Sequence, residues 1–75
     1  MKQVLVRALN RNQILILREI DGTETMTAFI RRAARIYGIS ESTLKANSRI
    51  LKNLGMITFG NSSVAMLTDF GVFAL

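Results

Sequence analysis

The side chains best suited to chemistry in this sequence are positively charged and gather in its middle. Between Thr25 and Thr68 there are six basic residues and one acidic residue, Glu41, so this segment carries the whole net charge of +5. The six are Arg31, Arg32, Arg35, Lys45, Arg49 and Lys52. A local excess of such groups attracts polyanions. The pattern favours a nucleic-acid partner, although charge alone is equally compatible with a solvated basic surface that has no partner.

Enzymatic chemistry is poorly served by the other side chains. The chain has no histidine and no cysteine, so it lacks the commonest general base, the best nucleophile and the usual ligands of structural zinc. The five carboxylates are scattered, and no glycine-rich phosphate loop is present. We therefore expect a protein that is not an enzyme and that needs no metal and no cofactor.

The arginines fall on a predicted helix whose other side is apolar. This helix begins at Thr25 or Thr27 and ends at Tyr37, before Gly38. Its apolar arc consists of Phe29, Ile30, Ala33, Ala34, Ile36 and Tyr37. The clean separation predicts that the helix packs on a core and turns its arginines outward. Tyr37 is expected in that core with its hydroxyl in water.

The lysines and Arg49 fall on the next predicted helix, from Ser40 to about Leu54. Ser40 to Thr43 offer N-cap hydroxyls, and Glu41 lies in the first turn, where the helix dipole favours an acid. One face holds Leu44, Leu51 and Leu54, with Ile50 at its border, and another holds Ser42, Lys45, Arg49 and Lys52. Asn47 lies towards the apolar side and is expected to be a partly buried hydrogen bonder.

Further elements complete the domain. Asn10 to Ile20 is predicted to form a first helix, although the apolar run in its middle is equally compatible with a strand. Met56 to Phe59 and Val64 to Leu67 are predicted strands joined by the turn Gly60 to Ser63. The tail Thr68 to Leu75 is either a last helical turn or an interface strand.

Two helices joined by the short turn Tyr37-Gly38-Ile39-Ser40 predict a helix-turn-helix, whose second helix enters the major groove of DNA. The segment from Ser42 to Gly71 resembles the winged-helix family of small transcriptional regulators of prokaryotic or archaeal type, viral and plasmid ones included. In that family the recognition helix ends in Leu-Gly, here Leu54-Gly55, and the hairpin closes on Leu-Thr-x-x-Gly, here Leu67 to Gly71. The resemblance implies an α+β winged helix-turn-helix of three helices plus a C-terminal two-stranded hairpin, forming one domain over residues 1–75.

The sequence departs from the family pattern in three places. The wing tip has Asn61, Ser62 and Ser63, where the family usually has Arg or Lys, so insertion of the wing into the minor groove is not implied. Ser48 occupies a position that is usually apolar. The brief strand often found between the first two helices has to fit into Gly22 to Met26.

The resemblance implies a sequence-specific regulator that binds double-stranded DNA. Its recognition helix, about residues 40–54, would lie in the major groove, with the wing, about residues 56–67, near the backbone or minor groove. The expected DNA contacts are Arg31, Arg32, Arg35, Ser40, Ser42, Thr43, Lys45, Arg49, Lys52, Asn61, Ser62 and Ser63. Two alternatives are a winged-helix module for protein–protein contact and a sequence-neutral architectural DNA-binding protein.

Apolar residues at both ends predict a homodimer, because a core this small cannot absorb them all. They are Val4, Leu5, Val6, Leu9, Val72, Phe73, Ala74 and Leu75. The alternative is that the ends fold back and complete the core of a monomer. Arg7 ends the first apolar run too early for a signal peptide, and no run approaches the roughly 20 residues of a membrane span. We expect a cytoplasmic protein with no membrane partner.

Overall fold

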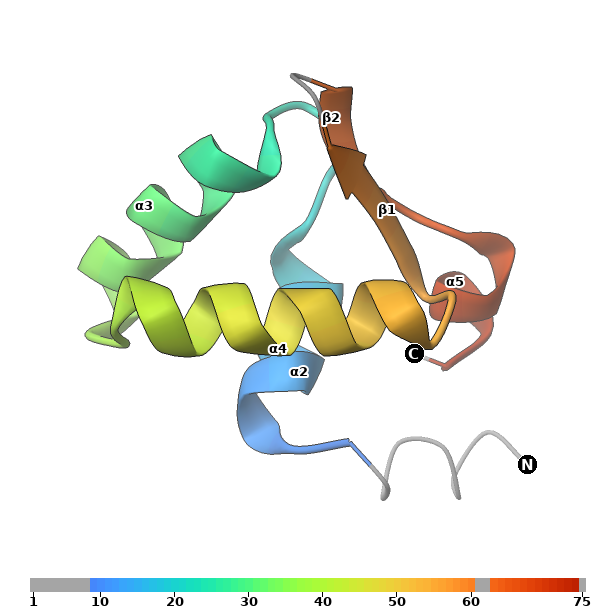
Figure 1. The fold of residues 1–75 in the computed structure, drawn as a ribbon, viewed down its shortest axis with the longest axis horizontal. Helices are drawn as coiled ribbons and strands as arrows, with labels where there is room; N and C mark the ends of the chain where they lie inside the picture. Colours follow the sequence, from blue (N-terminus) through green and yellow to red (C-terminus); the bar gives the residue numbers. More distant parts are fainter. Residues whose placement is uncertain (1–8, 61–62, 75) are drawn as a thin grey trace.

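The computed structural model describes residues 9–60 and 63–74. Helices α2 (Arg11–Glu19), α3 (Met26–Tyr37) and α4 (Glu41–Asn53) are followed by strands β1 (Ile57–Gly60) and β2 (Ser63–Leu67) and by the short helix α5 (Asp69–Ala74). In Figure 1, α4 runs across the molecule, with α3 and the hairpin above it and α2 below. This is the α+β winged helix-turn-helix that the sequence predicts. Within these ranges, no helix is long and apolar enough to cross a membrane.

Each of the three longer helices begins at a capping side chain. The carboxamide oxygen of Asn10 accepts a hydrogen bond from the Gln13 backbone N–H at 2.8 Å, and the Gln13 side chain accepts one from the Asn10 N–H at 3.0 Å. This reciprocal capping box fixes the start of α2. Thr25 and Ser40 cap α3 and α4 in the same way, each accepting from the N–H three residues on. The predicted helix limits are confirmed, and the first segment is a helix rather than a strand.

The turn between α3 and α4 depends on Gly38. Its φ of +67° lies in the left-handed region, which residues with a Cβ adopt at a cost. Its N–H donates to the Ala34 carbonyl oxygen at 3.0 Å and closes the last turn of α3. Gly38 therefore ends α3 and lets the chain reach Ser40, the N-cap of α4, two residues later.

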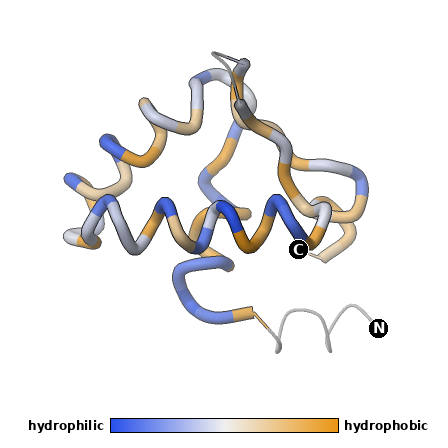
Figure 2. The backbone as a smooth tube through the Cα atoms, viewed as in Figure 1, coloured by the Kyte–Doolittle hydropathy of each residue, from blue (hydrophilic) through white to orange (hydrophobic). Residues whose placement is uncertain are grey.

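The core lies between the three helices and the hairpin. Its buried apolar residues are Ile16, Leu17, Ile20, Met26, Phe29, Ile30, Ala33, Leu44, Leu51, Met56, Ile57, Ala65 and Ala74. The prediction was wrong for Ile36, Tyr37 and Leu54, whose exposed fractions are 56%, 42% and 49%. They lie at the ends of α3 and α4, beyond the turns that pack on the core. The hydropathy colouring of Figure 2 shows apolar and polar residues alternating along α4.

The hairpin is antiparallel and includes a third, minimal partner. Ile57 pairs with Leu67, Thr58 with Met66 and Gly60 with Ser63, with an irregular register between Thr58 and Gly60. Thr25 forms an isolated bridge with Val64, and the Ala65 N–H donates to the Glu24 carbonyl oxygen at 2.9 Å. The brief strand expected within Gly22 to Met26 is thus a single bridge that ties the start of α3 to the wing.

The tail forms α5, which confirms the helical alternative. The Thr68 hydroxyl donates to the Gly55 carbonyl oxygen at 2.5 Å and accepts from the Gly71 N–H at 3.0 Å. A Cβ on Gly71 would collide with the Met56 carbonyl oxygen. The pattern Leu-Thr-x-x-Gly therefore has a structural cause. Its threonine caps α5, and its glycine lets α5 approach the turn after α4.

Candidate nucleic-acid interface

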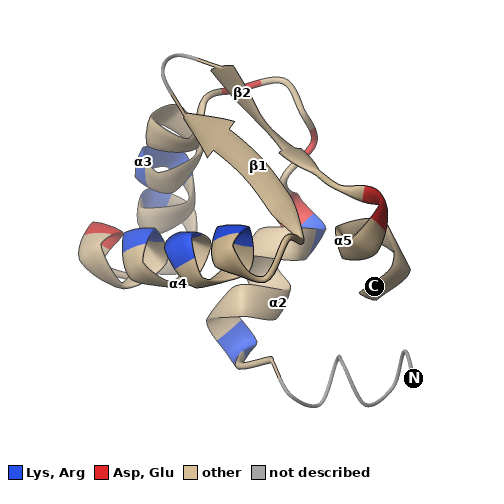
Figure 3. Cartoon of the chain, turned by 45° about the vertical axis from the view of Figure 1, so that its right-hand side comes forward, with Lys and Arg blue, Asp and Glu red and all other residues tan. Residues whose placement is uncertain are grey.

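One side of α4 presents three exposed basic residues in a row. Lys45, Arg49 and Lys52 follow each other at helical spacing and lie away from the buried Leu44 and Leu51. Figure 3 shows basic stretches along α4, with further basic stretches of α3 above them. We call Lys45, Arg49 and Lys52 the basic face. A helix that is apolar on one side and cationic on the other suits the major groove.

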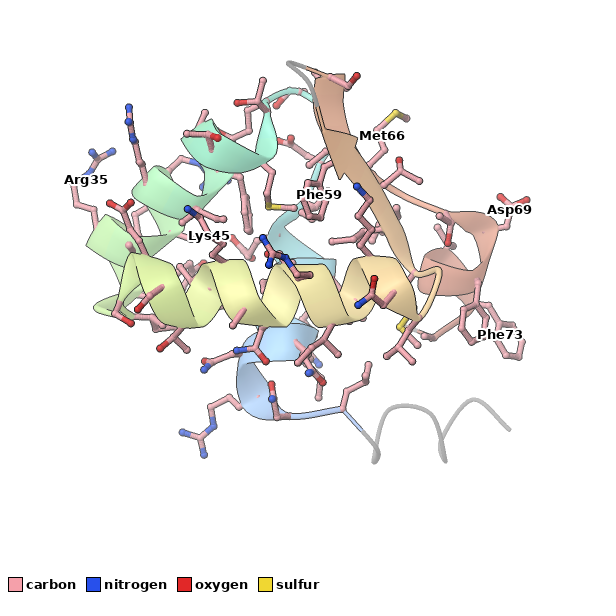
Figure 4. All side chains as sticks on the ribbon, in the orientation of Figure 1. Arg35, Lys45, Phe59, Met66, Asp69 and Phe73 are labelled. Atoms are coloured by element: carbon pink, nitrogen blue, oxygen red, sulfur yellow. The ribbon has the colours of Figure 1, made fainter. Side chains whose placement is uncertain are left out.

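Two arginines of α3 add to this charge. Arg31 and Arg35 are exposed and one helical turn apart. Arg31 borders the same hollow as Lys45 and Arg49, whereas Arg35 extends from the last turn of α3 into solvent (Figure 4). The structure therefore groups Arg31 with the basic face and leaves Arg35 at its edge.

Arg32 does not join this group. Its Nη2 and Nε atoms donate to Oε1 of Glu24 at 2.6 and 2.9 Å, and its guanidinium lies 5.6 Å from the centroid of the Phe29 ring. The hydrogen bond to Glu24 is the main reason that the pKa of Arg32 is raised. Glu24 precedes the segment from Thr25 to Thr68. The charge of that segment alone therefore did not reveal this ion pair.

Lys52 is engaged with the wing. Its Nζ donates to the Phe59 carbonyl oxygen at 2.9 Å and lies 4.6 Å from the centroid of the Phe59 ring. These contacts connect the last turn of α4 to β1. Lys52 is still exposed, so it can both hold the wing and contribute positive charge.

The predicted hydroxyl contacts separate into two groups. Ser40 and Thr43 are used within the helix cap, because Ser40 Oγ accepts from the Thr43 N–H at 3.2 Å and donates to Thr43 Oγ1 at 2.8 Å. Ser42 and Ser63 are exposed. Asn61 and Ser62 lie outside the described residues.

Asn47 is the partly buried hydrogen bonder that the sequence predicts. Its Oδ1 accepts from Nδ2 of Asn10 at 2.9 Å, and its Nδ2 donates to the Thr43 carbonyl oxygen at 2.8 Å. These bonds hold the start of α2 against α4. Asn47 therefore positions the recognition helix rather than facing the groove.

A hollow of about 340 Å³ lies between the start of α3, the basic face and the hairpin. It is lined by Thr25, Met26, Thr27, Ile30, Arg31, Glu41, Lys45, Ser48, Arg49, Phe59, Gly60 and Ser63. Ser48 is 0% exposed, and its Oγ has no hydrogen-bond partner within the described part of the chain. Sequence reasoning missed Thr25, Thr27 and Phe59 as neighbours of the basic face. The one feature of the sequence that pointed to this hollow was Ser48, a serine at a position expected to be apolar.

Comparison with known proteins identifies the same two helices. A family model described as "helix-turn-helix, Psq domain" matches residues 30–50, which cover the later part of α3, the turn at Gly38 and most of α4. No curated protein and no solved structure matches the chain. The match covers less than a third of the chain and does not extend to the wing. It supports DNA binding by this helix-turn-helix.

Proposed function

We propose that the protein is a sequence-specific transcriptional regulator that binds double-stranded DNA. The observation that carries the proposal is the basic face, which lies on the second helix of a matched helix-turn-helix. A helix with an exposed basic face fits the major groove, with its N-terminal residues nearest the base edges. Ser42, Lys45 and Arg49 are then the side chains that reach the bases.

The surrounding elements would contact the DNA backbone. Arg31 and Arg35 on α3 supply charge beside the recognition helix, where phosphates flank the groove. The wing follows the neighbouring backbone or minor groove, and Ser63 offers a hydroxyl there. Arg32 and Lys52 act mainly through their internal partners, Glu24 and Phe59. In this role the protein is not an enzyme and needs no cofactor.

The proposed working unit is a homodimer. On α5, Phe70, Val72 and Phe73 have exposed fractions of 40%, 59% and 51%. Leu9 is partly buried and Ala74 is buried, so some of the terminal apolar residues that the sequence left without a core already pack within one chain. Val4, Leu5, Val6 and Leu75 lie outside the described residues. An exposed apolar patch usually marks an interface, and two-fold dimers are the commonest oligomers.

Sedimentation without DNA tests the dimer. We expect a species of twice the chain mass at micromolar concentration, and a shift towards monomer in Phe73→Ser. Ile36→Ser is the control, because Ile36 is as exposed but lies on α3, far from α5 (Figure 1). A wild-type protein of monomer mass contradicts the dimer without affecting the proposal of DNA binding.

Selection from a random pool of duplex DNA tests the function itself. Enrichment of one motif supports a sequence-specific regulator, and a near-palindromic motif supports two recognition helices about 34 Å apart in a dimer. Retention without enrichment indicates a sequence-neutral architectural protein. Absence of retention indicates a protein-interaction module. A regulator of the prokaryotic type that the chain resembles would act in the cytoplasm.

A further inference from the structure

The hollow beside the basic face has two kinds of surface. Its apolar part is formed by Met26, Ile30 and Phe59, whereas Arg31, Lys45 and Arg49 contribute three positive charges against the single carboxylate of Glu41. Lys45 and Phe59 lie on either side of it in Figure 4. Its volume of about 340 Å³ lies at the small end of the range for ligand pockets. The shape and charge suit a compact apolar group that carries a negative charge.

Ser48 is the residue that packing alone does not explain. It is fully buried in α4, lines the hollow, and has a hydroxyl without a partner among the described residues. A buried hydroxyl without a hydrogen bond is unfavourable, and an alanine at this position would avoid the penalty. An acceptor atom on a molecule in the hollow would satisfy it.

The start of α3 lies beside the hollow. Met26 and Thr27, the first two residues of this 12-residue helix, both line the hollow. The positive end of the helix dipole therefore lies beside the hollow, and it favours an anion there. Three cationic side chains, the start of a helix and an unsatisfied hydroxyl thus border one space between α3 and α4.

We propose that this hollow binds a small organic anion, with an aromatic or similarly compact apolar body and a phosphate or carboxylate group. The apolar body packs against Met26, Ile30 and Phe59, and the anionic group lies between Arg31, Lys45 and Arg49. The consequence for regulation rests on the proposed function. Since Lys45 and Arg49 serve both ligands, the bound anion competes with DNA and acts as an effector.

Titration of the DNA-free protein with phenyl phosphate tests the site. Binding is monitored by the chemical shifts of the backbone amides. We expect saturable shifts at Thr27, Arg31 and Ser48, and weaker binding of inorganic phosphate, which has no apolar body. Ser48→Ala and Arg31→Gln should each reduce the affinity for phenyl phosphate roughly three- to tenfold, as expected for one lost hydrogen bond. The matched control Arg35→Gln, on the same helix but outside the hollow, should leave it unchanged. Shifts spread equally over all exposed basic residues, or equal affinities in Ser48→Ala and wild type, would overturn the proposal.

Competition on DNA separates this site from the DNA interface. Phenyl phosphate should displace DNA from the wild type at lower concentration than from Ser48→Ala, whereas both proteins bind DNA equally without it. If Ser48→Ala weakens DNA binding by itself and phenyl phosphate does not bind, the hollow takes a backbone phosphate and the effector site is refuted. A protein that binds phenyl phosphate but no DNA keeps the site and refutes the proposed function.

Discussion

Tyr37 is the single tyrosine of the chain, so titration of tyrosine reports on the pKa of this one side chain. Its hydroxyl donates to Oε1 of Glu19 at 2.7 Å, and this bond is the main reason that the pKa of the phenol is raised. A phenolate there would lose the bond and face a carboxylate. The hydroxyl of this exposed residue reaches across to Glu19, the last residue of α2.

We predict that the absorbance of the Tyr37 phenolate has its titration midpoint above the ordinary value and that Glu19→Gln lowers it. Because the folded pKa is raised, the stabilisation by this contact is fully present below the ordinary tyrosine pKa. It is lost as the pH rises through the folded value. Glu41→Gln, an exposed acid on α4, is the control and should not move the midpoint. Identical midpoints in Glu19→Gln and wild type would contradict the hydrogen bond.

Ser48 provides a second test at the residue scale. Replacing it by alanine removes a buried, unpaired hydroxyl without opening a large cavity, so Ser48→Ala should raise the free energy of unfolding by about 1 kcal/mol. Denaturant unfolding of the variant measures this change. Ser42→Ala, in the same helix but exposed, corrects for helix propensity. A larger stabilisation from Ser42→Ala than from Ser48→Ala would show that the Ser48 hydroxyl is satisfied in solution.

At the scale of elements, the limits of the three longer helices could be predicted because their signals are local. Asn10, Thr25 and Ser40 act on the next few residues, and Gly38 acts on its own turn. The state of the tail could not be chosen, because its mostly apolar residues fit a helix or a strand. It depends on Thr68 reaching Gly55, which lies far from it in the sequence.

The packing of α5 depends on Gly71, and Gly71→Ala tests it. The added Cβ would meet the Met56 carbonyl oxygen, which belongs to backbone and cannot move aside cheaply. We predict destabilisation by about 1–3 kcal/mol, typical of overpacking, measured by thermal unfolding. Val72→Ala, at the exposed neighbouring position, should change stability little. Equal unfolding temperatures for Gly71→Ala and wild type would mean that α5 does not dock in this way.

At the scale of the whole molecule, the sequence predicted the fold and the side that carries the positive charge. It did not predict the contacts that each charged side chain makes. Arg32 and Lys52 belong to the basic segment, yet one pairs with Glu24 and the other bonds to Phe59. Such partners follow from how α3 and the hairpin meet, which helical periodicity does not describe. In the same way, periodicity placed Leu54 on the apolar side of its helix. It could not show that Leu54 lies beyond the part of the helix that packs on the core.

The internal contacts of Arg32 and Lys52 change the expected salt dependence of DNA binding. Arg31, Arg35, Lys45 and Arg49 make no ion pair within the described residues. If these four neutralise phosphates, log affinity should fall with log salt with a slope of roughly −3 to −4. Six contacts would give about −5. Fluorescence anisotropy across a salt series measures the slope, and an affinity almost independent of salt would argue against DNA as the partner.

We propose that α4 reads the DNA sequence through its basic face. The most direct measurement compares the affinity for the motif selected from the random pool with the affinity for unrelated duplex. We measure this ratio in the wild type and in the Lys45→Ala/Arg49→Ala double variant. Both replaced residues are exposed, so the variant should remain folded.

We predict a ratio of at least about a thousand for the wild type. For the double variant we predict that the binding free energy weakens by about 1–3 kcal/mol per lost contact. This loss should affect the selected motif more than the unrelated duplex. A folded variant with the wild-type affinity and ratio would show that Lys45 and Arg49 do not contact DNA, and would contradict sequence reading by α4.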